Sequence, residues 1–118
     1  MRPDVLGRLE DILEAIGYIE EDTVGLEFDG FMADRRRRQS VERNFQIIGE
    51  AINRLRRHAP DISEHITSAD QIVDFRNVVV HGYDVIDYSR VWSIIHEQLQ
   101  ITRGEVERIL QDAEHDAL

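Results

Sequence analysis

Residues 76–83 bring together side chains that can bind phosphate and transfer protons: Arg76, Asn77, His81 and Tyr83. The guanidinium of Arg76 can stabilise charge on a phosphate, and the imidazole of His81 can act as a general acid or base. Asn77 precedes His81 by four residues, which places both on one face of a helix. Gly82 lets the chain turn, so that the phenol of Tyr83 returns beside the imidazole. Such a cluster can cleave RNA without a metal, by activating a ribose 2′-hydroxyl to attack its own phosphate.

The same spacing also allows purely structural roles. A histidine near a helix end is commonly a capping or packed residue, and Arg76 can instead pair with Asp74 or with a carboxylate of the preceding long helix. Tyr83 can simply pack over Gly82. From residue types and spacing alone, the catalytic and the structural interpretations both remain open.

Four consecutive arginines form a second unusual feature, at the start of a predicted helix: Arg35, Arg36, Arg37 and Arg38. Cations oppose the dipole at a helix N-terminus, so this run does not serve to stabilise the helix. It can contact the phosphates of RNA. Alternatively, it offsets the acidic first helix in solvent or docks a partner protein.

The other histidines give no metal-binding pattern. His58, His65, His96 and His115 form neither a His-x3-His pair nor a His-Glu-x-x-His run, so we predict no metal site and place them at the surface or at an interface. The chain has no cysteine, which excludes disulfides, iron–sulfur clusters and a cysteine nucleophile. We expect no cofactor.

Apolar residues recur at helical spacing in two segments that precede the motif. Spacings of four, three, four and three residues join Val5, Leu9, Ile12, Ile16 and Ile19, and again Val41, Phe45, Ile48, Ile52 and Leu55. The first pattern predicts a helix that begins near Pro3 and stops within residues 22–25, followed by a loop that includes residues 29–30. The second predicts a helix from about residue 34 to 57, which Pro60 ends.

The motif lies at the end of a third predicted helix, over residues 69–81, which Gly82 can end in a left-handed conformation. The negative end of the helix dipole then favours the protonated form of His81. Ser68 and Gln71 can form a capping box at the start of this helix, after a short connector helix or turn near residues 61–67.

A last helix is predicted over residues 88–113, because apolar side chains recur there at spacings of three and four: Trp92, Ile95, Leu99, Thr102, Val106 and Ile109. Valines 78–80 favour a strand by type, but a lone strand would have no partner in this chain. Trp92 and Phe45 fall on the apolar stripes and are therefore expected in the core. The sequence predicts an all-α fold, an antiparallel four-helix bundle.

Length and charge indicate one domain, residues 1–118, of a soluble cytoplasmic protein. No continuous apolar run marks a signal peptide or a membrane span. The net charge of -10 argues against coating nucleic acid through a broad basic surface. The charge is uneven, however, since residues 1–34 hold two arginines against ten acidic residues, whereas residues 35–60 hold eight arginines against two. All 14 basic residues are arginine, which can contact phosphate in a bidentate manner.

The motif resembles the Arg-x4-His-x-Tyr signature of HEPN-domain ribonucleases, here formed by Arg76, His81 and Tyr83. In the order Arg-Asn-Val-Val-Val-His-Gly-Tyr it is similar to the HepT branch of bacterial toxins. Residues 38–51 resemble the corresponding helix of that family, and the similarity extends over nearly the whole chain. The resemblance implies a metal-independent endoribonuclease toxin with a HEPN-like bundle.

The family resemblance further implies a homodimer and an antitoxin. Two copies of the motif would face each other, giving a composite site with two Arg76 and two His81 side chains. One imidazole can then act as base and the other as acid on opposite sides of one phosphate. The implied antitoxin is a minimal nucleotidyltransferase that attaches AMP to Tyr83, which would fill the pocket and place a phosphate against Arg76 and His81.

Two other classes of function are compatible with the sequence. The first is a non-catalytic helical adaptor that binds a nucleotide or a nucleotidyltransferase partner through the same groove, an interpretation that the net acidity favours slightly. The second is a purely structural dimeric bundle, which leaves the grouping of Arg76, Asn77, His81 and Tyr83 without a purpose.

Overall fold

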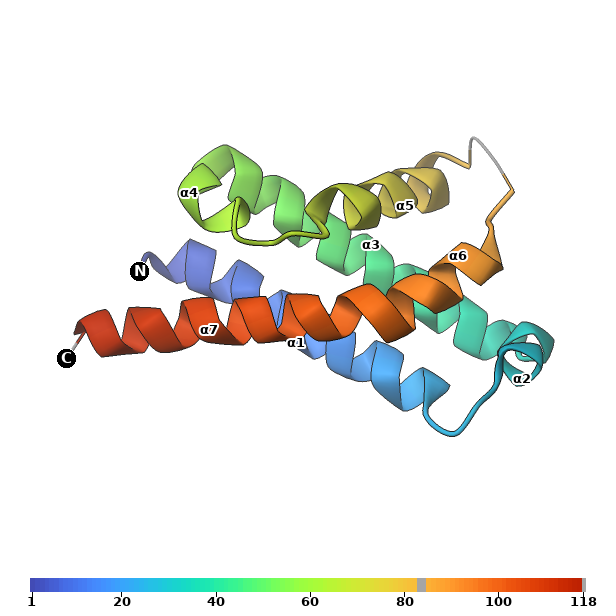
Figure 1. Cartoon of the computed structure of the whole chain (residues 1–118). Coiled ribbons are helices and arrows are strands. Elements are labelled where there is room, and N and C mark those ends of the chain that lie inside the picture. Colours follow the sequence, from blue (N-terminus) through green and yellow to red (C-terminus); the bar gives the residue numbers. More distant parts are fainter. Residues whose placement is uncertain (83–84, 118) are drawn as a thin grey trace.

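Four long helices dominate the computed structural model, which describes residues 1–82 and 85–117. They are α1 (Pro3–Thr23), α3 (Arg35–His58), α5 (Ala69–His81) and a last helix composed of α6 (Tyr88–Ser93), η1 (Ile94–Gln98) and α7 (Leu99–Ala117). Successive long helices run in opposite directions (Figure 1). α3 packs against both α1 and α5, and α1 also packs against α7. The described residues contain no strand, so the predicted all-α, antiparallel arrangement is confirmed.

The apolar stripes predicted for the first two long helices form the centre of the core, and Trp92 and Ile109 of the last stripe pack against it while partly buried. Every member of the α1 stripe from Val5 to Ile19 and of the α3 stripe from Val41 to Leu55 is buried. Burial of one such side chain contributes roughly 1.5–3 kcal/mol. Phe45 lies in this core, edge-on to Phe75 of α5 with 5.0 Å between ring centroids, so α5 is anchored on α3 by aromatic packing as well.

Most helix boundaries lie close to those predicted, although the last helix continues to Ala117, four residues beyond the predicted end. Asp34 caps α3 by accepting a hydrogen bond of 3.1 Å from the backbone of Arg37. Pro60 opens a short helix, α4 (Pro60–Ser63), as the predicted connector requires. The prediction of a capping box at the start of α5 was wrong, because Ser68 has turn dihedral angles and its side chain accepts no cap hydrogen bond.

A six-residue helix, α2 (Phe28–Ala33), occupies the segment that we expected to be loop. Its Phe31 is fully buried, with its ring 6.2 Å from that of Tyr88 and 5.1 Å from that of Trp92. The burial of Phe31 against the rings of Tyr88 and Trp92 thus stabilises this short helix against α6.

The last helix also departs from a regular pattern, in η1. The backbone N–H of Leu99 bonds the carbonyl of Ile94, five residues earlier, which is the wider turn of a π-helix. Ile94, Ile95 and Leu99 are all buried. The extra residue in the turn thus keeps three apolar side chains on the core side.

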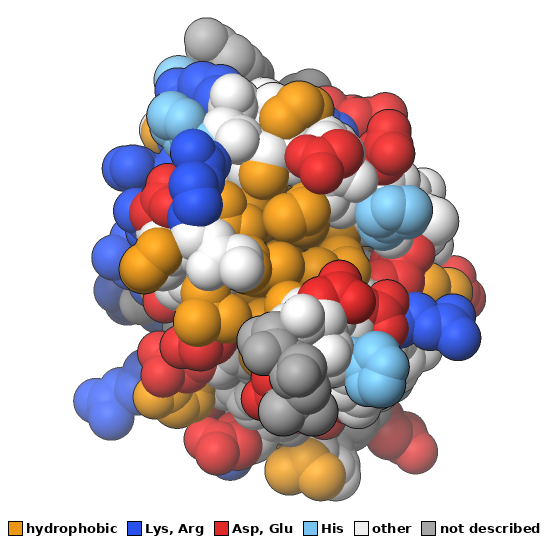
Figure 2. Space-filling model, turned by 90° about the vertical axis from the view of Figure 1, so that its left-hand side faces the viewer, with side chains coloured by type: hydrophobic (Ala, Val, Ile, Leu, Met, Phe, Trp, Pro, Cys, Tyr) orange, Lys and Arg blue, Asp and Glu red, His pale blue; other side chains and the backbone are white. Residues whose placement is uncertain are grey.

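Figure 2 looks onto the end of the molecule that carries α4 and both termini, where hydrophobic side chains gather at the centre. Met1, Ile62 and Ile109 help to line a hollow of about 440 Å³ at this end. No described helix combines the length with the apolar character needed to cross a membrane.

Candidate active site

Arg76 lies on the face of α5 that packs against α3, directly opposite Gly49. A Cβ atom built on Gly49 would lie 2.5 Å from Cβ and 2.7 Å from Cγ of Arg76, closer than carbon atoms pack. Because Gly49 has no side chain, the two helices can approach closely here, and the aliphatic part of the Arg76 side chain packs between them.

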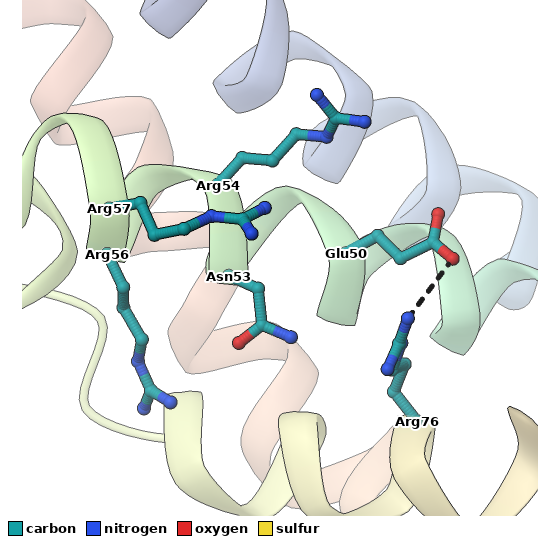
Figure 3. Close-up of a pocket in the computed structure, with 6 residues that line it drawn as sticks. All are labelled: Glu50, Asn53, Arg54, Arg56, Arg57 and Arg76. Carbon is teal, nitrogen blue, oxygen red and sulfur yellow. Dashed lines mark hydrogen bonds and ion pairs between the residues drawn. The ribbon is translucent and has the colours of Figure 1, made fainter. Parts of the chain in front are cut away.

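Two polar side chains contact the guanidinium of Arg76 directly, and a third contacts one of these two. Its Nη1 donates a 3.0 Å hydrogen bond to Oδ1 of Asn77, and its Nη2 lies 3.5 Å from Oε1 of Glu50 on α3 (Figure 3). Glu50 in turn accepts a 3.3 Å hydrogen bond from the amide of Gln46. The structure thus contains the pairing of Arg76 with a carboxylate of the preceding long helix that the sequence left open. The Arg76 side chain is 20% exposed, so the oriented cation remains within reach of a ligand.

His81 is the last residue of α5 and is exposed. Gly82 follows with φ of 61° and ψ of 30°, and its N–H bonds the carbonyl of Val78 at 2.9 Å. The predicted left-handed end of the helix is therefore confirmed, and His81 stands at the C-terminal, negative end of the helix dipole. Tyr83, the remaining residue of the motif, lies outside the described residues.

Helix geometry sets how Arg76 and His81 relate to each other. Five residues of α-helix separate them by about 140° around the axis and about 7.5 Å along it. Arg76 consequently faces α3, whereas His81 projects from the end of α5. Asn77 accepts the hydrogen bond from Arg76 and lies one turn before His81 on α5.

An arginine-rich groove, which sequence reasoning missed, adjoins Arg76. It encloses about 540 Å³ and is lined by Glu50, Asn53, Arg54, Arg56, Arg57 and Arg76. Figure 3 shows the α3 residues on one side and Arg76 of α5 on the other. The excess of arginine in residues 35–60 is the signal in the sequence that points to this groove.

The arginine run at residues 35–38 divides into two pairs. Arg37 lies 3.0 Å from the carboxylate of Asp34 and donates to the carbonyl of Asp22, while Arg38 donates to the carbonyl of Met32 and covers the ring of Tyr88. Arg37 therefore connects α3 with the end of α1, and Arg38 connects α3 with α2 and α6. Arg35 and Arg36 are exposed and line a separate hollow.

Tyr88 and Glu42 form a further polar contact between α6 and α3. The phenol donates a 2.9 Å hydrogen bond to Oε2 of Glu42. Burial, and then the hydrogen bond and the charge of Glu42, raise the pKa of Tyr88 above its ordinary value of 10.0. This pair could not be predicted from the sequence, because 46 residues separate its members.

The remaining histidines are all exposed, as predicted: His58, His65, His96 and His115. Within residues 1–82 and 85–117, no three His, Asp or Glu side chains gather closely enough to hold a metal ion.

Comparisons with known proteins agree on one family. The model of the family described as "Ribonuclease HepT-like" matches residues 12–109. The "Probable ribonuclease HepT" of Thermococcus cleftensis is 31% identical, over 86% of this chain and 91% of its own. A protein of Methanocaldococcus jannaschii that is named as a candidate RNase is 30% identical, over 96% of this chain and 93% of its own. No solved structure gives a significant match.

Proposed function

Because this chain belongs to the HepT-like ribonuclease family, we propose that it cleaves RNA without a metal, through Arg76 and His81. The family match confirms the resemblance seen in the sequence and spans both α3 and the whole motif. As a member of this family, the chain is an endoribonuclease. The observation that carries the choice of residues is the position of Arg76, whose stem packs against Gly49 and whose guanidinium contacts Asn77 and Glu50, on the helix that ends at His81.

The proposed reaction is an internal transfer at one phosphodiester. One His81 imidazole removes the proton of a ribose 2′-hydroxyl, and the 2′-oxygen attacks the adjacent phosphorus. The bond between phosphorus and the 5′-oxygen breaks, and a second, protonated His81 gives its proton to that oxygen. The products are a 2′,3′-cyclic phosphate and a 5′-hydroxyl. Arg76 stabilises the charge that develops on the phosphate oxygens, and Asn77 orients Arg76.

We place the complete site across a homodimer. One chain supplies one imidazole, and Arg76 and His81 point in directions about 140° apart, so a second motif has to complete the constellation. Apolar residues beside the motif support this arrangement, since Val80 is 39% exposed and Val85 is 91% exposed. A two-fold interface would cover them by using one surface twice.

The family membership also supports a role as a toxin that acts on RNA in the cytoplasm and is neutralised by a nucleotidyltransferase antitoxin. An AMP group on Tyr83 would place its phosphate against Arg76 and His81 and block RNA. Co-expression with such a transferase should raise the intact mass of the chain by one AMP. The Tyr83→Phe variant should show no increase.

A non-catalytic adaptor is the second candidate, favoured by the net charge of -10 and by the pairing of Arg76 with Glu50. Expression of the chain without its antitoxin separates the two functions. A nuclease toxin should arrest growth, and Arg76→Ala or His81→Ala should each abolish the arrest. Unimpaired growth with the folded wild-type chain, or arrest by both variants, would favour the adaptor.

A further inference from the structure

The arginine-rich groove at the end of α3 is the strongest local concentration of positive charge beside the proposed site. Four of its six lining residues are arginines, and one, Glu50, is acidic. The whole chain, in contrast, carries a net charge of -10. A groove with an excess of three positive charges in such a chain creates a local field that attracts anions, although the molecule as a whole repels them.

The four arginines have different partners. Arg76 pairs with Glu50, and Arg56 pairs with Asp70 of α5, so each of these bonds connects α3 with α5 across the groove. Arg54 and Arg57 are exposed, and neither side chain takes part in any ion pair found among the described residues. Arg56 and Arg76 therefore connect the two helices, and the exposed side chains of Arg54 and Arg57 can bind a ligand.

We propose that this groove binds the phosphates of single-stranded RNA on one side of the bond that is cut, with Arg54 and Arg57 as the contacting residues. The proposal rests on the proposed function, because Arg76 belongs both to the groove and to the catalytic motif. A strand lying along α3 passes Arg57 and Arg54 and reaches Arg76 with its next phosphates. Guanidinium groups suit this task, since each can bind phosphate through two parallel hydrogen bonds.

The shape and the chemistry of the groove favour a strand over an enclosed small ligand. Its two unpaired cations stand at the rim, where successive phosphates of a backbone can meet them. The lining residues include no aromatic side chain on which a base could stack. We therefore expect this side of the RNA to be held through its backbone, with little preference for base sequence.

The arginines at residues 35–38 are less suited to this role. Arg37 is engaged with Asp34 and with the end of α1, and Arg38 is engaged with α2. Arg35 and Arg36 line a different hollow with Asp34. Position 35 lies 19 residues from position 54 along the same helix, which corresponds to about 28 Å. Arg35 and Arg36 thus provide a matched pair of exposed charges outside the groove.

The test uses a 2′-O-methyl oligoribonucleotide, which cannot undergo attack by the 2′-oxygen and therefore reports binding alone. Its affinity is measured by fluorescence anisotropy over a range of salt concentrations for the wild type, R54Q/R57Q and R35Q/R36Q. We expect R54Q/R57Q to bind roughly tenfold more weakly, with the slope of log affinity against log salt reduced by about 1.4, or about 0.7 for each lost phosphate contact. Thermal unfolding should be unchanged, because both side chains are exposed and unpaired.

Several results would overturn the proposal. They are an unchanged affinity and slope in R54Q/R57Q, an equal loss in R35Q/R36Q, or no binding by the wild type. If R54Q/R57Q binds RNA normally but escapes neutralisation by the antitoxin, the groove is instead a protein-docking surface. Cleavage of unmodified RNA by the same samples separates the two claims. A wild type that cuts RNA while R54Q/R57Q binds normally contradicts the groove alone, whereas a wild type that binds but never cuts contradicts the proposed function.

Discussion

Gly49 of α3 and Arg76 of α5 meet so closely that a single added carbon atom would not fit, with 2.5 Å between the built Cβ and Cβ of Arg76. The contact fixes the distance between two helices and, at the same point, the position of the cation that we assign to catalysis. Fold and site therefore depend on the same pair of residues.

Replacement of Gly49 by alanine should destabilise the protein by about 1–3 kcal/mol, because the methyl group meets the rigid beginning of the Arg76 side chain. Urea unfolding followed by circular dichroism measures the change. Gly17→Ala is the matched control, since a Cβ there meets nothing within 4 Å and alanine is the better helix former by up to about 1 kcal/mol. Equal stability of the two variants would contradict the close approach.

Glu50→Gln should separate RNA binding from turnover. The substitution removes a negative charge beside the RNA, so KM should fall, while the looser guanidinium of Arg76 should lower kcat by roughly tenfold. The side-chain oxygen that accepts from Gln46 is retained, which limits structural damage. Steady-state cleavage kinetics provide both constants, with exposed Glu10→Gln as the control. A variant with unchanged kcat would remove Glu50 from the positioning of Arg76.

Subunit mixing tests whether the site is shared between two chains. Wild type incubated with an excess of the His81→Ala variant should lose most of its activity per wild-type subunit, because each mixed dimer contains one His81 side chain instead of two. RNA cleavage is measured before and after the time needed for subunit exchange. Activity that stays constant through complete exchange would mean that one chain contains the whole site.

The helices could be predicted from sequence wherever their apolar stripes are long. The stripe from Val41 to Leu55 placed α3 to within one residue at each end, because five buried side chains fix its period. α2 escaped prediction because six residues provide too few apolar positions for a period, and its helix depends on Phe31 meeting distant rings. Ser68 was misassigned because capping depends on a backbone angle that sequence pattern does not specify.

The site was predictable only where its parts are neighbours in sequence. The left-handed Gly82 and the grouping of Arg76, Asn77 and His81 lie within one motif and could be predicted, whereas the hydrogen bond between Arg76 and Asn77 was not. Gly49 lies 27 positions before Arg76, and a glycine within a helix does not reveal what packs on it. The arginine-rich groove likewise forms only when α5 brings Arg76 beside the end of α3.

Tyr88 predicts a dependence of stability on alkaline pH. Its pKa is raised in the folded state by burial and by Glu42, so the unfolded chain ionises first, and stability falls as pH rises above 10.0. Tyr88→Phe loses the hydrogen bond to Glu42 and should be less stable by about 0.5–1.5 kcal/mol at neutral pH. Because phenylalanine does not ionise, this variant does not lose stability at alkaline pH through position 88. Its unfolding free energy should therefore approach that of the wild type above pH 10. A gap that widens there would contradict the assignment.

The most direct test of the account is the chemistry of the RNA ends that the purified chain produces in the presence of EDTA. We predict 2′,3′-cyclic phosphate and 5′-hydroxyl ends from the wild type, and a loss of at least about 100-fold in rate for His81→Ala, in line with removal of a general acid or base. Complete loss of wild-type cleavage on chelation, or full activity of His81→Ala, would contradict it.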